Sequence, residues 1–160
     1  MPEKIERKTG KLDGRELRIG IVLSRWNREI TEELLRGALR ALEVCAVPKE
    51  KITILEVPGA MEIPVAAQAL LSTPVDAIIA IGCVIKGETA HFEHVGRTAL
   101  DGIARLAMRS RIPVTCGILT TYDIEQARAR SGQDDDNAGS QAALAAVEVA
   151  NLIVSLQPIF

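Results

Sequence analysis

The chain has 160 residues, of which 48 % are hydrophobic and 25 % are charged, and its formal net charge at pH 7 is −2. This length predicts a single domain with a core of its own. The mixed charges argue against a protein that binds nucleic acid or a membrane surface. The three cysteines, Cys45, Cys83 and Cys116, are odd in number, far apart and set in apolar runs. We therefore expect reduced, buried thiols, with no disulfide framework and no metal site.

The first residues are charged and contain no hydrophobic segment of the signal type. We expect no run long enough to span a bilayer, and therefore a cytoplasmic protein. Residues 1–16 predict an N-terminal tail, with a short strand around Ile5 that would need a partner to stay ordered. Residues 17–156 form the predicted domain, and residues 157–160 form a C-terminal tail.

Four apolar runs predict strands, at residues 17–23, 52–57, 75–81 and 112–119. Segments with a helical period separate them, and a final helix follows the acidic loop 132–137. Strands that are joined by helices must run parallel, and right-handed crossovers cover both faces of the sheet. The sequence therefore predicts an α/β fold, a three-layer α/β/α sandwich with a flavodoxin-like, four-stranded parallel sheet.

In such a sheet the loops after the strands gather at the carboxyl edge, where ligands bind. We expect four loops there, at residues 24–27, 58–62, 82–92 and 120–123. Gly87-Glu88-Thr89 offers backbone N–H groups and a hydroxyl to a phosphate-sized anion, and Arg130 could add a bidentate cation. Short loops with glycine and threonine are common, however, and most arginines are simply solvated.

Three further side chains each have two interpretations. His91 is a hydrogen-bonded surface imidazole or a general acid and base near neutral pH, and with His94 alone it makes a poor metal site. Glu62 is a charge at a helix start or an acceptor for the hydroxyls of a polyol. Trp26, beside Asn27, is ordinary packing or a platform on which a flat heterocycle stacks.

Several segments, taken in order and with their spacing, resemble the 6,7-dimethyl-8-ribityllumazine synthase family of riboflavin biosynthesis. The resemblance covers nearly all of residues 15–156. Its motifs are Arg25-Trp26-Asn27, Val57-Pro58-Gly59-Ala60 with Glu62-Ile63-Pro64, Gly82 to Thr89 with His91-Phe92, Pro113-Val114 with Gly117, Glu125-Gln126-Ala127 with Arg130, and Asn137 with Gly139.

The resemblance implies a reaction and a set of sites. A ribitylamino-pyrimidinedione condenses with a four-carbon butanone phosphate, without a metal or an organic cofactor. His91 is then the proton-transfer residue. The implied phosphate-binding residues are Gly87, Glu88, Thr89 and Arg130. The implied pyrimidine- and ribityl-binding residues are Trp26, Asn27, Ala60, Met61, Glu62, Val84, Ile85 and Cys116.

The resemblance also implies self-association. Sites of the family lie between adjacent subunits of a pentamer, which stacks or forms a sixty-subunit shell in some members. The N-terminal tail is then a candidate strand for exchange with a neighbouring subunit.

The chain departs from the family pattern at several positions. Met61 stands where an aromatic residue is usual, and Cys116 where a neighbouring subunit usually contributes a phenylalanine. Ala138 replaces the lysine of an Asn-Lys-Gly motif, and Asp134-Asp135-Asp136 makes the nearby loop acidic. We expect reduced or altered activity. Two alternatives stay open, a non-catalytic assembly that binds flavin or lumazine, and a purely structural shell on the same scaffold.

Overall fold

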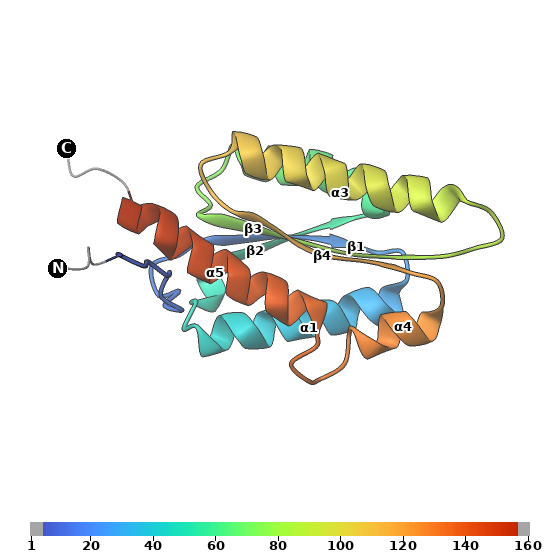
Figure 1. Ribbon diagram of the computed structural model, residues 1–160, viewed down its shortest axis with the longest axis horizontal. Coiled ribbons are helices and arrows are strands. Elements are labelled where there is room, and N and C mark those ends of the chain that lie inside the picture. Colours follow the sequence, from blue (N-terminus) through green and yellow to red (C-terminus); the bar gives the residue numbers. More distant parts are fainter. Residues whose placement is uncertain (1–4, 157–160) are drawn as a thin grey trace.

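The computed structural model describes residues 5–156, so the predicted C-terminal tail lies outside the described residues. Its sheet has the four parallel strands that the sequence predicted (Figure 1), and their order is β2-β1-β3-β4. The strands are β1 (Ile19–Ser24), β2 (Ile52–Val57), β3 (Ala77–Ile85) and β4 (Val114–Thr121). The helices are α1 (Arg28–Val44), α2 (Ile63–Leu70), α3 (His91–Arg109), α4 (Ile124–Ala129) and α5 (Ala138–Leu156), with short turns η1 (Lys49–Lys51) and η2 (Ala60–Glu62).

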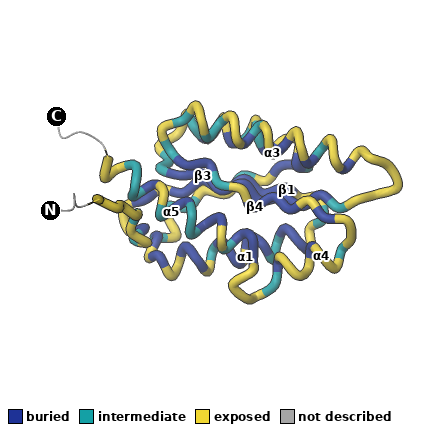
Figure 2. Tube along the Cα trace, in the orientation of Figure 1, coloured by how far each residue is buried: buried dark blue, intermediate teal, exposed yellow. Residues whose placement is uncertain are grey.

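Helices cover both faces of the sheet and give three layers, as Figure 1 shows. Successive residues of a strand point to opposite faces, and β3 illustrates the consequence. Ile79 packs in the cluster with α1 and α5, whereas Ile78 packs in the cluster with α2 and α3. Burial is accordingly concentrated along the strands and the inner faces of the helices (Figure 2). The predicted three-layer α/β/α, flavodoxin-like architecture is confirmed.

Two strands extend further than the sequence predicted. β3 continues through Gly82 to Ile85, and β4 continues to Thr121, because these two ends pair with each other in register. The predicted loop 82–92 is therefore shorter and consists of residues 86–90, before α3 begins at His91. This loop projects from the end of the sheet (Figure 1).

One helix contradicts the expectation that no run is long enough to span a bilayer. Among the described residues, α5 is long and apolar enough to cross a membrane by length and composition alone. It has 19 residues and a mean hydropathy of 1.4. The high hydropathy of α5 comes in part from its many alanines, which let the helix pack closely against the core. Ala142, Ala146 and Val147 are buried in the core cluster with α1, and a core helix can meet the same criteria.

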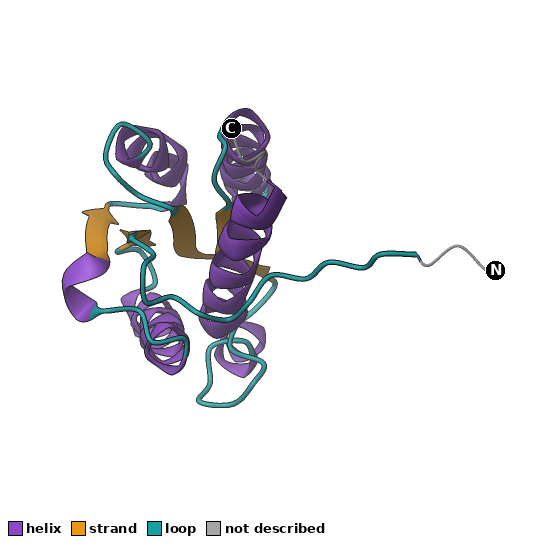
Figure 3. Ribbon diagram, turned by 90° about the vertical axis from the view of Figure 1, so that its left-hand side faces the viewer, coloured by secondary structure: helices purple, strands orange, loops and turns teal. Residues whose placement is uncertain are grey.

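The end of the predicted N-terminal tail lies against its own domain. The side-chain amide of Asn151 on α5 donates hydrogen bonds to the carbonyl oxygens of Lys11 and Asp13, at 2.7 and 2.9 Å. Further out, the chain leads away from the body of the domain (Figure 3), and Ile5 is exposed and belongs to no strand. Exchange of this segment with a neighbouring subunit stays a prediction.

Candidate active site

A cavity of about 380 Å³ opens at the carboxyl edge of the sheet. We call it the edge cavity. It is formed by the turn after β1, η2, the end of β3, the following loop and the start of α3. The predicted site residues in its lining are Trp26, Asn27, Ala60, Met61, Glu62, Val84, Ile85, Gly87, Thr89 and His91. Three of the four loops expected at the carboxyl edge, residues 24–27, 58–62 and 82–92, therefore meet in one place, whereas residues 120–123 are not in the lining.

The turn after β1 places the indole of Trp26 at this cavity. The backbone N–H groups of Arg25 and Trp26 donate to the carbonyl oxygens of Val57 and Pro58, at 2.8 and 3.1 Å. Asn27 has a left-handed backbone with φ of 57°, a conformation that asparagine tolerates better than most residues. Trp26 itself is 72 % exposed, so the indole is not part of the core and is accessible to a ligand.

Glu62 closes the turn after β2. Its Oε2 accepts a 2.9 Å hydrogen bond from the backbone N–H of Gly59. This oxygen therefore has the first of the two roles expected for Glu62, that of a charge at a helix start. The bond also fixes the carboxylate at the cavity wall. Its second oxygen makes no hydrogen bond within the described part of the chain, and it can accept one from a ligand hydroxyl.

The end of β3 forms an apolar wall of the edge cavity. Val84 is buried among residues of α2 and α3, and Ile85 is half-buried and packs toward the other core cluster. The strand is held in place to its end, since the backbone N–H of Lys86 donates to the carbonyl oxygen of Thr121 at 2.9 Å. A planar ring could therefore lie between this wall and Trp26.

The loop after β3 leads into the amino end of α3. The Thr89 hydroxyl accepts a 3.3 Å hydrogen bond from the backbone N–H of His91. No heavy atom lies within 4 Å of a side chain built at Gly87, so the space beside it is open. The N-cap residue of α3, Ala90, makes no side-chain hydrogen bond to the helix. The helix dipole favours an anion at such an end, and the exposed imidazole of His91 lies directly beside it.

Three predicted residues lie outside the lining of the edge cavity. Glu88 belongs to the same loop but is not part of the wall. Cys116 is exposed on the edge strand β4, contrary to the expectation that all three thiols are buried. Arg130 follows α4, and its guanidinium donates to the carbonyl oxygen of Asp136 and the side chain of Gln141, both at 3.1 Å. One protomer therefore does not bring Arg130 to Thr89.

The cavity also contains four residues that the sequence did not predict as site residues, namely Gly59, Cys83, Phe92 and Val95. Burial raises the pKa of the Cys83 thiol from 9.0 to about 11. This thiol is protonated at neutral pH and is a poor nucleophile. Phe92 makes an edge-on contact with Tyr122, with ring centroids 6.0 Å apart. In the sequence, Phe92 was marked only by its place in the His91-Phe92 motif.

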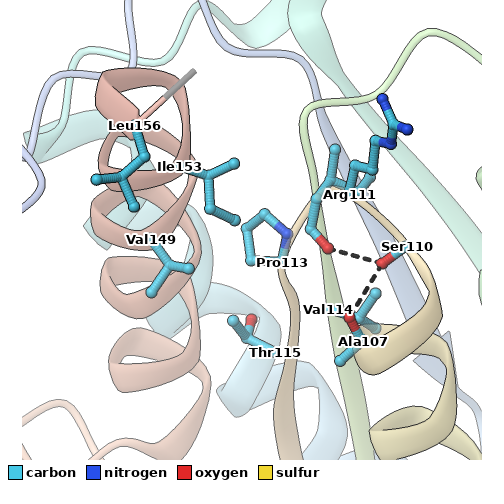
Figure 4. A pocket seen from close by; sticks show the side chains of 10 residues that line it. Ala107, Ser110, Arg111, Pro113, Val114, Thr115, Val149, Ile153 and Leu156 are labelled. Atoms are coloured by element: carbon cyan, nitrogen blue, oxygen red, sulfur yellow. Dashed lines mark hydrogen bonds between the residues drawn. The ribbon is translucent and has the colours of Figure 1, made fainter. Parts of the chain in front are cut away.

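A larger groove of about 850 Å³ lies between α5 and the segment that enters β4 (Figure 4). Its walls are mainly aliphatic, with Val149 and Ile153 on one side and Ile112 and Pro113 on the other. Arg111 is its one ionisable lining residue. The predicted site residues are absent from this groove, and it offers no acid–base pair. The chemistry of the described residues is concentrated in the edge cavity.

Residues 5–156 contain no group of three or more metal-ligating side chains. The edge cavity brings together an exposed ring, a fixed carboxylate, the amino end of a helix and an imidazole. Residues 16–154 match the family model described as 6,7-dimethyl-8-ribityllumazine synthase. The chain belongs to this family. Family membership assigns it to the transferases of riboflavin biosynthesis and implies small-molecule substrates and an oligomeric assembly.

Proposed function

We propose that the chain condenses 5-amino-6-ribitylaminopyrimidinedione with 3,4-dihydroxy-2-butanone 4-phosphate to give 6,7-dimethyl-8-ribityllumazine, phosphate and water. One observation carries this proposal. Trp26, Glu62 and His91, which come from three separate segments of the chain, line the same cavity. A stacking ring, a polyol acceptor and a proton carrier are the three groups that this pair of substrates requires.

The pyrimidinedione ring would stack on Trp26 and contact Val84 and Ile85. Asn27, Ala60 and Met61 complete this part of the site, and Glu62 accepts hydrogen bonds from the ribityl chain. Hydrogen bonds to an ionised acceptor are about twice as strong as neutral ones. The free oxygen of the Glu62 carboxylate, fixed by Gly59, supports this assignment.

The phosphate group would lie at the amino end of α3, against Gly87, Glu88 and Thr89. The substrate amine attacks the ketone carbonyl, and loss of water gives a Schiff base. A proton is then removed beside that imine, phosphate leaves, and the ring closes with loss of a second water. His91 takes and returns these protons, since an imidazole can both accept and donate a proton in general acid–base catalysis. Its place beside Thr89 supports this role.

Arg130 and Cys116 belong to this site only if a neighbouring subunit contributes them. Both are exposed, and Cys116 lies on the edge strand of the sheet. We therefore propose a pentamer, or a multiple of pentamers, in which each edge cavity is completed by the next protomer. A cytoplasmic location is part of the proposal and is supported by the three cysteines, which are unpaired among the described residues.

We propose that turnover is lower than in a typical family member. A thiol at Cys116 offers less apolar surface than the usual phenylalanine. Ala138 is buried against the core and supplies no cation near the anionic ligand, while the acidic loop adds negative charge. A wild-type turnover number equal to that of a typical member would contradict this part of the proposal.

The test measures the formation of the lumazine product from both substrates, through the absorbance of that product. Trp26 is the one tryptophan of the chain, so quenching of its fluorescence reports ligand binding in the same sample. The proposed function predicts turnover together with quenching by the pyrimidine substrate. Quenching by riboflavin without turnover would favour a binding protein, and neither signal would favour a structural shell.

A further inference from the structure

Arg130 is held along one edge of its guanidinium group. Its Nε–H donates to the main-chain oxygen of Asp136 and its Nη2–H to Oε1 of Gln141, both at 3.1 Å. A guanidinium carries five N–H donors in a rigid fork with two usable edges. The contacts occupy the Nε–Nη2 edge. The Nη1–Nη2 edge, which can bind an anion with two parallel hydrogen bonds, has no partner among the described residues.

Both the oxygen and the nitrogen of the Gln141 side-chain amide make hydrogen bonds in this arrangement. While its oxygen accepts from Arg130, its Nε2 donates to the carbonyl oxygen of Asp135 at 3.0 Å. Gln141 belongs to the first turns of α5, where its own backbone N–H donates to the carbonyl oxygen of Asn137. The guanidinium is therefore tied to a helix through one side chain and is not free to sample many rotamers.

The groups that hold Arg130 are all neutral. The acidic loop contacts the guanidinium through the main-chain oxygen of Asp136, and no ion pair joins Arg130 to a carboxylate within residues 5–156. The Asp134 carboxylate accepts instead from the backbone N–H of Asp136, at 3.2 Å. A carboxylate at position 141 would neutralise the guanidinium, whereas an amide orients it and leaves its positive charge intact.

We propose that Gln141 is a positioning residue for phosphate recognition. It fixes one edge of the Arg130 guanidinium so that the other edge, with its charge uncompensated, faces the phosphate of the butanone substrate in the neighbouring subunit's cavity. This inference rests on the proposed function, because Arg130 must be the phosphate ligand. The amide itself does not touch substrate.

The test compares two substitutions that add the same charge to the same region. Gln141→Glu places a carboxylate on the guanidinium, whereas Gln133→Glu places one on an exposed residue of the loop that makes no hydrogen bond to Arg130. In the assembled enzyme we expect Gln141→Glu to raise the KM for the butanone phosphate by roughly tenfold, as expected when a bidentate cation is neutralised. Gln133→Glu should change it by less than about twofold. The inhibition constant of inorganic phosphate should rise in parallel, while the KM for the pyrimidine stays constant.

Gln141→Met keeps the length of the side chain and removes both hydrogen bonds, so it covers the case in which the glutamate variant does not assemble. It should also raise the KM for the butanone phosphate, by several-fold, because the guanidinium is no longer oriented. If Arg130→Ala raises this KM and the two Gln141 variants do not, or if Gln133→Glu matches Gln141→Glu, the inference is overturned. If Arg130→Ala itself leaves phosphate binding unchanged, the assignment of Arg130 in the proposed function fails instead.

Discussion

The side-chain amide of Asn27 donates a 2.8 Å hydrogen bond to the main-chain carbonyl oxygen of Cys83. This bond joins the turn after β1 to the last residues of β3, on either side of the edge cavity. Trp26 is held by the same turn, so the bond fixes the distance between the indole and the apolar wall at Val84. The slot in which we propose that the substrate ring binds is therefore held open by the protein's own contacts.

Substitutions of Asn27 separate its backbone role from its side-chain role. Asn27→Gly keeps the left-handed backbone without strain and loses the bond to Cys83, which should reduce the free energy of unfolding by about 1 kcal/mol. Asn27→Ala also strains the backbone and should lose roughly 1 kcal/mol more. Urea denaturation measures both. Equal losses in the two variants would contradict the role of the backbone conformation.

Glu62 offers a second prediction. Glu62→Gln keeps an acceptor oxygen but removes the charge, so we expect the KM for the ribitylamino-pyrimidinedione to rise by roughly three- to tenfold. The KM for the butanone phosphate should stay within about twofold of the wild-type value. Glu56→Gln is the matched control, since Glu56 is exposed on β2 outside the cavity lining. Equal effects on both substrates would exclude a specific role in polyol binding.

Stability should fall at alkaline pH because of Cys83. Its folded-state pKa of about 11 lies above the ordinary value of 9.0, since burial disfavours the thiolate. The folded state therefore binds the proton more tightly than the unfolded state. The preference of the folded state for the protonated thiol contributes about 2 to 3 kcal/mol to the free energy of unfolding. This contribution is complete below pH 9 and is lost between pH 9 and 11.

The measurement is chemical denaturation of wild type and Cys83→Ala from pH 7 to 11. The variant should be less stable at neutral pH because of the cavity it creates. The difference between the two proteins should then narrow above pH 9. Parallel curves over the whole range would show that the Cys83 thiol does not titrate in this way.

Asn137 is a buried connection between the acidic loop and two helices. Its amide nitrogen donates to the carbonyl oxygens of Glu33 and Gly132, and its oxygen accepts from the backbone N–H of Ser140 at 2.9 Å. A side-chain carbon at Gly37 would clash with this amide, so only glycine leaves room for it. These contacts set the position of the loop that carries Arg130.

Asn137→Ala should therefore lower the free energy of unfolding by about 2 to 4 kcal/mol, because buried backbone groups lose their partners. It should also raise the KM for the butanone phosphate, through displacement of Arg130. Asn151→Ala removes another bridging amide, at the far end of α5, and serves as the control. A KM effect of the same size in Asn151→Ala would attribute the change to general destabilisation.

The sequence determined the fold because its signals are local. Apolar β-branched runs and helical stripes gave the order of elements, and that order leaves few parallel arrangements. The ends of β3 were misplaced because Gly82 resembles a strand terminus. Its pairing with Ile118 across the sheet depends on residues far along the chain, and local periodicity does not contain that information.

The sequence predicted which residues of one protomer meet at the edge cavity. Trp26, Glu62 and His91 each follow a strand, and parallel strands bring such positions to one edge. The exposure of Cys116 could not be predicted, because it depends on β4 being the last strand of the sheet. The contacts of Arg130 with Gln141 and Asp136 could not be predicted either, since glutamine has no distinctive sequence pattern in a helical turn.

The central claim is that the edge cavity is an active site in which His91 carries protons. The most direct measurement is the turnover number of His91→Ala beside that of His94→Ala, an exposed histidine on the same helix that does not line the cavity. We predict that the turnover number falls by about 100-fold or more in His91→Ala and by less than about twofold in His94→Ala. Turnover that is retained in His91→Ala, or lost equally in both variants, would contradict the claim.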